Sequence, residues 1–246
     1  MEFSQSLIES ICNAEHLLFF TGAGISAESG IHTFRGEGGL WNKFKPEELA
    51  NMDAFMRNSD LVWEWYQYRR SVVHAAQPNA GHTTIAELEN NFPVDVVTQN
   101  IDGLHRRAGS TSIYELHGNI DRNYCLSCGK RYDYLSFNGN TAPLCDSCGS
   151  KIRPDIVWFG EMLPTGIFEQ AEQIAREADV CFVVGTSGVV YPAAYIPFAA
   201  RDYGKIIVEV NPEKTDMTTM STYSLRGKSG EVLPELFGKV LEMRKR

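Results

Sequence analysis

Short apolar runs alternate along the chain with segments whose apolar residues recur at helical spacing. Most runs of strand length end in glycine or polar residues, and they begin at Leu17, Val94, Ile113, Ile156, Val180 and Ile206. Helical spacing marks residues 4–14, 46–76 and 81–90, with a break in the middle segment near residues 58–60. Buried strands that alternate with helices are typical of a sheet covered on both faces. The pattern predicts an α/β fold built on a Rossmann-like, doubly wound parallel sheet.

The run that starts at Leu17 leads into a glycine-rich turn with the spacing Gly22-x-Gly24-x-x-Ala27. In a dinucleotide site, the first glycine permits a tight turn and the second lets backbone N–H groups approach the phosphates. The third small residue lets the helix pack on its strand, and the helix N-terminus faces the anion. An ordinary glycine-rich turn is the alternative. No acidic residue ends a second strand about 20 residues on, as an ordinary dehydrogenase would require.

Four of the six cysteines form two Cys-x-x-Cys pairs, Cys125 with Cys128 and Cys145 with Cys148, each followed by a glycine. This spacing is typical of a zinc ribbon, in which four thiolates fill a tetrahedral site and leave no position for water. We therefore expect one structural zinc per chain, with a redox dithiol or chance as the alternatives. The surrounding segment lacks strong apolar periodicity and should depend on the metal for its shape.

Composition narrows the range of partners. The 246 residues are 43% hydrophobic and 22% charged, as in globular enzymes. A formal net charge of -8 argues against binding to nucleic acid. No apolar run approaches the ~18 residues of a membrane span, and the N-terminus lacks the regions of a signal peptide. We expect a cytoplasmic protein without nucleic-acid or membrane partners; the sequence leaves its oligomeric state open, with a monomer as the working expectation.

A series of motifs occurs in one order along the chain. They are Gly22-Ala23-Gly24-Ile25-Ser26, Phe34-Arg35-Gly36, Thr98-Gln99-Asn100-Ile101-Asp102, Leu116-His117-Gly118, the cysteine pairs, Val157-Trp158-Phe159-Gly160-Glu161 and Gly185-Thr186-Ser187. Each motif is weak alone, but together and in this order they resemble the sirtuins, over residues 17–237. The resemblance implies an NAD-dependent protein deacylase that acts on acylated-lysine proteins or peptides. NAD would be the co-substrate, and the products would be free lysine, nicotinamide and O-acyl-ADP-ribose.

The same resemblance implies how the chain is divided. The Rossmann-like NAD-binding domain would comprise residues 1–40, 77–118 and 155–246. A small domain would combine a helical module at 41–76 with a zinc-ribbon module at 119–154.

Residue roles also follow from the resemblance. His117 would be the general base for the ribose hydroxyls, in a catalytic group with Asn100 and Asp102, a role that suits a side chain titrating near neutrality. A histidine at a strand end is otherwise a hydrogen-bonded or solvated bystander, which we expect of His16, His32, His74, His82 and His105. The implied NAD-binding residues are Gly22, Ala23, Gly24, Ser26, Ala27, Phe34, Arg35, Trp41, Gln99, Asn100, Ile101, Asp102, Gly185, Thr186, Ser187, Asn211 and Ser229. The acyl-peptide would add as a strand between two segments, whose binding residues are Val157, Trp158, Phe159, Gly160, Gly188, Val189 and Tyr191.

The acyl pocket carries a more specific signal. Tyr66 and Arg69 share one helix face and resemble the pair that marks the sirtuin subgroup preferring succinyl- and malonyl-lysine. A guanidinium offers a bidentate fork to a carboxylate, and a tyrosine hydroxyl adds a donor. The alternative is an exposed helix with Arg69 and Arg70 in solvent. We expect the other aromatic residues of this helix in the core, namely Trp63, Trp65 and Tyr68.

Two other functions compete with the deacylase. One is a non-catalytic NAD-binding protein with the same fold, and the presence of His117 counts against it because a binder needs no base. The other is an enzyme that transfers ADP-ribose to a protein side chain. The chain departs from its relatives at His32, where they carry a proline, so the loop that follows should be freer before NAD binds.

Overall fold

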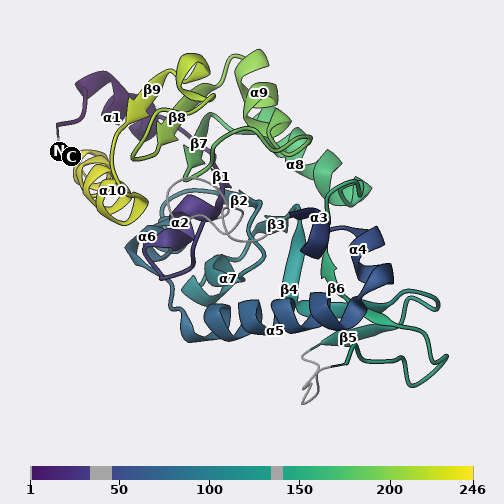
Figure 1. The fold of residues 1–246 in the computed structure, drawn as a ribbon. Helices are drawn as coiled ribbons and strands as arrows, with labels where there is room; N and C mark the ends of the chain where they lie inside the picture. Colours follow the sequence, from purple (N-terminus) through teal and green to yellow (C-terminus); the bar gives the residue numbers. More distant parts are fainter. Residues whose placement is uncertain (1, 34–45, 134–140, 246) are drawn as a thin grey trace.

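The computed structural model describes residues 2–33, 46–133 and 141–245. A six-stranded sheet contains β1 (Leu17–Thr21), β2 (Val94–Thr98), β3 (Ile113–Glu115), β7 (Val180–Val184), β8 (Ile206–Val210) and β9 (Tyr223–Leu225). The strand order is β3-β2-β1-β7-β8-β9, and every neighbouring pair is parallel (Figure 1). Counted along the chain, these strands follow the Rossmann order 3-2-1-4-5-6. The predicted doubly wound parallel sheet is therefore confirmed.

Helices cover both faces of this sheet. One face packs against α1 (Gln5–Cys12), α6 (Ala80–Leu88) and α10 (Ser229–Arg244), and the other against α8 (Thr165–Glu177) and α9 (Tyr195–Asp202). Alternate residues of β1 enter the two cores, Phe19 on the first face and Phe20 on the second, and all five positions of the strand are buried. The Phe19 and Phe182 rings stack with centroids 4.8 Å apart. Two short helices follow the central strands, α2 (Ala23–Ala27) and α7 (Leu104–Ala108).

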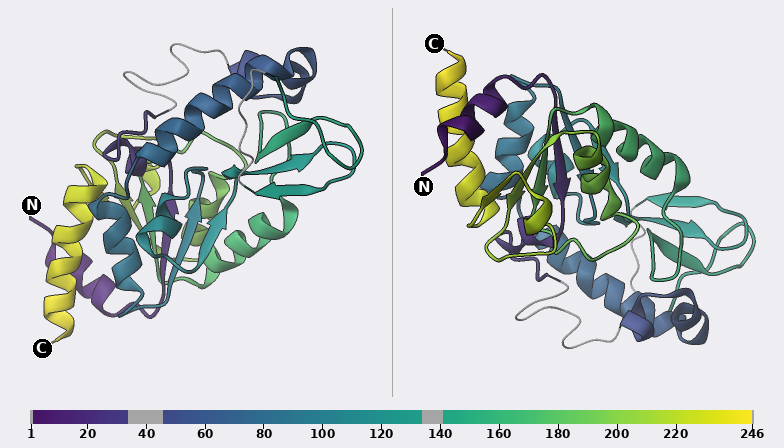
Figure 2. Two further views of the ribbon diagram at one scale, coloured as in Figure 1. Left: turned by 90° about the horizontal axis from the view of Figure 1, so that it is seen from below. Right: turned by 90° about the horizontal axis from the view of Figure 1, so that it is seen from above.

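A second, antiparallel sheet has the order β5-β4-β6 and contains β4 (Gly118–Cys125), β5 (Arg131–Asp133) and β6 (Ile152–Ile156). Three helices accompany it: α3 (Pro46–Leu49), α4 (Met52–Arg57) and α5 (Ser59–Ala75). The views from below and above show α5 alongside this sheet (Figure 2). Trp63 Nε1 donates to the Ile152 carbonyl at 2.8 Å and Arg70 Nε to the Ile120 carbonyl at 2.7 Å, which fixes α5 to β6 and β4.

Three details differ from the sequence prediction. The run 156–159 is not a strand of the large sheet, because β6 ends at Ile156 and pairs with β4. Residues 46–76 form three helices instead of two. Asn58 caps the start of α5 near the predicted break, and Asn51 caps the start of an additional helix, α4. The edge strand β9 and the 3-10 turn η2 (Thr218–Met220) were not predicted. No helix within the described ranges has both the length and the apolar character that crossing a membrane requires.

Candidate active site

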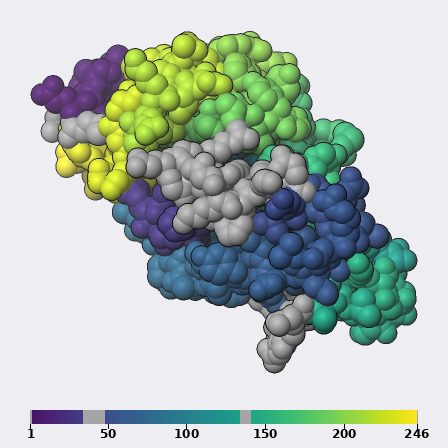
Figure 3. Space-filling view, viewed as in Figure 1, coloured from purple at the N-terminus to yellow at the C-terminus, as the bar shows by residue number. Residues whose placement is uncertain are grey.

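A cleft of about 820 Å³ lies where β1, β2, β7 and β8 end. This is the edge at which the strand order reverses, the usual ligand position in an open α/β sheet. In the space-filling view, the C-terminal segments occupy the upper half of this face and α3 to α5 the lower half (Figure 3). Predicted site residues that line the cleft are Gly22, Ala23, Gly24, Ala27, Tyr66, Gln99, Asn100, Ile101, His117, Val157, Trp158, Phe159, Gly160, Gly185, Thr186, Ser187, Val189, Tyr191, Asn211 and Ser229. The predicted Phe34, Arg35 and Trp41 lie outside the described residues.

The glycines of the first turn permit close packing. Gly22 alone connects β1 to α2, and its carbonyl accepts from the Ile25 N–H at 3.2 Å, so the chain turns tightly here as predicted, although Gly22 itself is extended, with φ -126° and ψ -172°. A Cβ on Gly22 would lie 2.7 Å from Thr186 Cβ, and one on Gly24 would lie 2.7 Å from Gly185 Cα. The start of α2 therefore packs directly against the end of β7. Ala27 differs from its prediction, since it is exposed at the cleft instead of packing on the strand.

His117 follows β3 and is held in one tautomer. Its Nδ1 lies 2.9 Å from the Gln99 carbonyl oxygen, which can only accept a hydrogen bond. In the neutral ring the proton therefore sits on Nδ1, and Nε2 keeps its lone pair. Burial lowers the pKa of His117, with the bond to Gln99 acting in the opposite direction. The ring is thus neutral at pH 7 and able to accept a proton.

Behind the cleft wall, Ser26 joins two of the predicted residues. Its Oγ donates to Asp102 Oδ2 at 2.7 Å, and Asn100 Nδ2 donates to Ser26 Oγ at 3.3 Å and to the Gly22 carbonyl at 3.0 Å. Burial raises the pKa of Asp102, while bonds from the Leu104 N–H and from Ser26 lower it. Among described residues, Asn100 lines the cleft but Ser26 and Asp102 do not, and Ser26 connects Asp102 to Asn100 by hydrogen bonds.

Two further histidines lie buried beneath this network. His82 Nδ1 accepts from the Asn79 N–H at 3.4 Å, which directs its Nε2 proton toward Ser26 Oγ at 3.5 Å. His105 Nε2 lies 3.0 Å from Thr21 Oγ1, and the two imidazoles meet edge to face with centroids 4.9 Å apart. Burial lowers the pKa of His82 to about 4 and that of His105 well below its usual range. Both are hydrogen-bonded core residues rather than solvated ones.

At the other end of the cleft, Tyr66 of α5 is 2% exposed and accepts a 2.8 Å hydrogen bond from Trp158 Nε1. Burial raises the pKa of Tyr66 to about 12, so the hydroxyl stays protonated. Arg69 is also buried, with Cζ 5.7 Å from the Trp65 ring centroid, and it is not among the described residues of the cleft lining. Burial lowers the pKa of Arg69, and nearby Tyr66 and Asp102 partly offset this effect.

The rest of α5 corrects the view of a helix with solvated arginines. Arg70 is buried, with its Cζ 4.9 Å from the Trp63 ring centroid, and its Nε donates to the Ile120 carbonyl. Burial lowers the pKa of Arg70 to about 10. Tyr68, predicted in the core, is 54% exposed because it lies on the outer face of α5, while Trp63 and Trp65 are buried as predicted. Arg70 therefore packs α5 against the smaller sheet.

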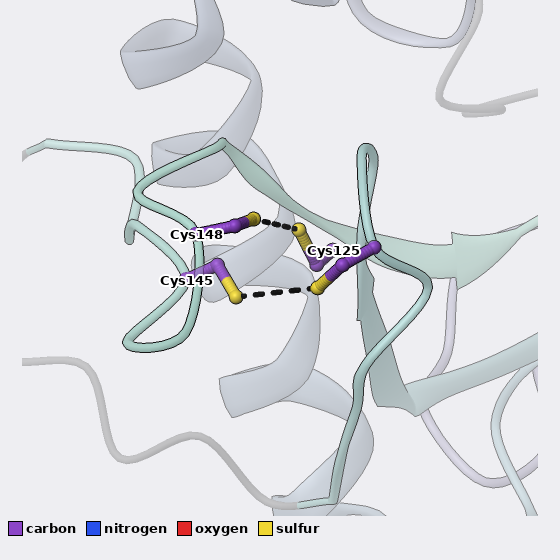
Figure 4. Close-up of side chains that lie close together, drawn as sticks. Cys125, Cys145 and Cys148 are labelled. Atoms are coloured by element: carbon purple, nitrogen blue, oxygen red, sulfur yellow. Dashed lines mark hydrogen bonds between the residues drawn. The ribbon is translucent and has the colours of Figure 1, made fainter.

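The four predicted metal ligands form one cluster. All four sulfurs lie within 4.8 Å of one another, with Cys125 and Cys148 at 3.4 Å and Cys128 and Cys145 at 3.6 Å (Figure 4). A tetrahedral zinc with bonds of about 2.3 Å separates its sulfurs by roughly 3.8 Å, so the cluster fits zinc. The glycine after each pair has the positive φ expected of a metal-wrapping turn, +70° and +71°. None of the four cysteines is in the described cleft lining, as a structural metal requires.

The sequence prediction missed an acidic residue of the cleft lining, between α2 and α10. Glu28 lines the cleft, and its Oε2 accepts from the Gly230 N–H at 2.8 Å and from Ser229 Oγ at 3.2 Å, at the start of α10. No local pattern marks Glu28, because its partners lie about two hundred positions away along the chain. Residues 212–216 also line this part of the cleft.

The Rossmann strand order, a cleft at its reversal point and a four-thiolate cluster define a dinucleotide-binding α/β protein with a structural metal module. The Sir2 family profile matches residues 22–192, and the chain belongs to this family. A relative from Aquifex aeolicus (strain VF5), named NAD-dependent protein deacylase, is 50% identical over 229 residues, or 92% of this chain and 96% of the relative. A Sir2 homologue solved with ADP-ribose has a TM-score of 0.96 at 44% identity, covering 99% of this chain and 98% of that one. A Sir2 homologue–NAD complex has a TM-score of 0.93 at 45% identity, with 99% and 96% covered.

Proposed function

We propose that this protein is an NAD-dependent protein-lysine deacylase whose acyl pocket also takes dicarboxylic acyl groups such as succinyl and malonyl. One observation carries the proposal: a single cleft connects the glycine turn after β1, the His117 ring and the Tyr66 wall. Such a cleft can hold a dinucleotide and an acyl-lysine end to end. Membership of the Sir2 family and the name of the Aquifex aeolicus relative support the reaction.

NAD supplies the ribose carbon that the acyl oxygen attacks as nicotinamide leaves. In our proposal, His117 Nε2 then removes a proton from a ribose hydroxyl, which prepares that oxygen to accept the acyl group. Its tautomer supports this role, because the Gln99 carbonyl holds the proton on Nδ1 and leaves Nε2 as the base. Water completes the transfer, and lysine, nicotinamide and O-acyl-ADP-ribose leave the site.

The two halves of the cleft would divide the recognition. Asn100 would hold the nicotinamide ribose, kept in place by its bonds to Ser26 and the Gly22 carbonyl, with Asp102 behind it. The adenosine half would use Asn211, whose Nδ2 donates to the Thr186 carbonyl. The remaining proposed contacts there are Gly185, Thr186, Ser187 and Ser229.

The acyl-peptide would lie between residues 157–160 and 188–191. Phe159 and Tyr191 line the cleft and are 48% and 55% exposed, so apolar surface is available for a peptide backbone and its flanking side chains. Four clustered thiols are stable as metal ligands in a reducing compartment, which supports our expectation of the cytoplasm.

The reaction and its rivals separate in one experiment. The protein is incubated with NAD and an acetyl- or succinyl-lysine version of one peptide, and all products are weighed by mass spectrometry. If the protein is a deacylase, O-acyl-ADP-ribose and deacylated peptide should form in equal amounts. A mass gain on a protein would instead indicate an ADP-ribosyltransferase, and an absence of turnover would indicate a binding protein.

The dicarboxylic preference is tested at Arg69. Arg69→Met keeps length and apolar packing but removes the charged donors, each hydrogen bond to a charged group being worth about 1.5 to 3 kcal/mol. We expect desuccinylation efficiency to fall roughly tenfold to a hundredfold, while deacetylation stays level or rises. Equal losses on both substrates would assign Arg69 to the fold and refute the dicarboxylic pocket.

A further inference from the structure

The indole of Trp158, a residue of the proposed peptide-binding segment, contacts Tyr66 in the cleft lining. Trp158 follows β6 and is 2% exposed, and its Nε1 donates to the Tyr66 hydroxyl oxygen at 2.8 Å across two distant parts of the chain. An indole N–H can only donate. The Tyr66 oxygen is therefore an acceptor in this bond, and its own proton must point elsewhere.

The direction left for that proton is toward the cleft. Within residues 2–33, 46–133 and 141–245, no acceptor forms a hydrogen bond with the Tyr66 hydroxyl, and Tyr66 lines the cleft. A buried hydroxyl whose oxygen is already engaged stays a donor for an incoming group. A carboxylate, which only accepts, is the chemical complement of such a donor.

An ion pair between buried Arg153 and half-buried Glu161 keeps the indole from turning away. The Arg153 guanidinium, 1% exposed, lies over the Trp158 ring with Cζ 3.5 Å from the ring centroid and pairs with both oxygens of Glu161. Glu161 Oε2 also accepts from the Trp158 N–H at 2.8 Å. Main chain and ring of Trp158 are thus fixed together by Arg153 and Glu161.

We propose that Trp158 is a positioning residue for acyl specificity: by donating to the Tyr66 oxygen, it directs the Tyr66 proton into the acyl pocket, where it meets the distal carboxylate of a dicarboxylic acyl-lysine. This inference rests on the dicarboxylic pocket proposed above. A residue of the proposed peptide-binding segment would thus orient the Tyr66 hydroxyl and contribute to the discrimination between succinyl- and acetyl-lysine.

The test is a double-mutant cycle in the ratio of succinyl to acetyl catalytic efficiency. Trp158→Phe keeps an aromatic ring but removes the N–H, and it should lower the ratio about three- to tenfold, the range of one net hydrogen bond. Tyr66→Phe should lower the ratio by at least as much. In the double variant, Trp158→Phe should change the ratio no further, because its effect passes through the hydroxyl.

Trp63→Phe is the matched control. It removes another buried indole N–H, one that donates to the Ile152 carbonyl and not to Tyr66, so it should lower thermal stability and leave the ratio unchanged. A ratio that falls equally in Trp63→Phe would show a general effect of packing and overturn the proposal.

A spectroscopic readout tests the bond itself. In the ¹H–¹⁵N spectrum of the folded protein, the indole signal absent from Trp158→Phe identifies Trp158. That signal should move upfield in Tyr66→Phe, because its acceptor is gone. An unmoved signal would refute the bond, whatever the activities are.

The outcomes distinguish a failure of this inference from a failure of the dicarboxylic pocket on which it rests. If Tyr66→Phe leaves the ratio unchanged, the hydroxyl does not meet the carboxylate, and both the inference and the tyrosine's part in the dicarboxylic pocket fail. If Tyr66→Phe lowers the ratio but Trp158→Phe does not, or if their effects add, the pocket stands and the positioning role of Trp158 is refuted.

Discussion

Acid should destabilise this protein through His82. The side chain is fully buried, and burial lowers its pKa to about 4, against about 6.5 in an unfolded chain. Between these values the unfolded chain binds a proton at this position and the folded protein does not, so stability falls as the pH falls. Each pKa unit corresponds to ~1.4 kcal/mol, so His82 alone accounts for about 3 kcal/mol by pH 4 and about 2 kcal/mol at pH 5.

The assay is urea unfolding at pH 7 and at pH 5, with His82→Gln compared with wild type. The variant should be less stable at pH 7, because it loses the hydrogen bonds to Asn79 and Ser26, yet its loss of stability on acidification should be smaller by about 2 kcal/mol. Loss of zinc in acid would also weaken the protein, but both proteins would share this contribution and it would cancel in the comparison.

Asn79→Ala is the control for helix capping. It removes the side chain that accepts from the Gly81 N–H at the start of α6 but keeps His82 and the backbone N–H that His82 accepts. It also removes the hydrogen bonds from Asn79 Nδ2 to the Ile25 carbonyl and to Ser29 Oγ, so it should cost about 1 to 3 kcal/mol at both pH values and leave the drop between them as in wild type. If His82→Gln loses as much stability on acidification as wild type, the buried neutral imidazole is not the source of the acid sensitivity.

Two other predictions concern the metal and the base. Removing zinc with a chelator should abolish activity and shift the melting curve down, because α5 packs on the sheet that carries the cysteines; unchanged turnover after verified zinc loss would contradict this. His117→Ala should still bind NAD and acyl-peptide but form product roughly two to four orders of magnitude more slowly, and rates within a few-fold of wild type would remove His117 from the mechanism. Because burial lowers the pKa of His117, the acidic limb of wild-type catalytic efficiency should lie below pH 6.5; a limb above that value would point to another group.

Much of the fold could be predicted because parallel strands buried on both faces leave a plain signal. The runs at Leu17, Val94, Val180 and Ile206 became the four central strands. The cysteine spacing predicted a cluster whose sulfurs come together as a zinc site requires. The run 156–159 was misplaced because a short apolar stretch does not reveal which sheet it joins, and only the pairing of β6 with β4 decides this.

The glycine turn shows a different limit. The spacing of Gly22 and Gly24 predicted a tight turn and a close approach of the backbone to phosphates. The turn is present, but the group that lies close to both glycines is the protein's own segment at Gly185 and Thr186, and the approach to phosphates stays a prediction. A Cβ at either position would clash with the residues that follow β7, whether or not a ligand is bound. The small residues at these positions therefore have a structural reason independent of the dinucleotide, and their presence alone could not identify the ligand.

The directions in which the side chains of the site point could not be predicted from the sequence. Helical spacing placed Tyr66 and Arg69 on one face of α5, yet Tyr66 lines the cleft and Arg69 is not among its described lining. The two side chains have different partners: Trp158, from another part of the chain, donates to the Tyr66 oxygen, whereas Trp65, one turn earlier on α5, lies against the Arg69 guanidinium. Helical spacing therefore predicts which side chains share a face of α5, but not which of them reach the cleft, because that depends on the segment packed against the helix.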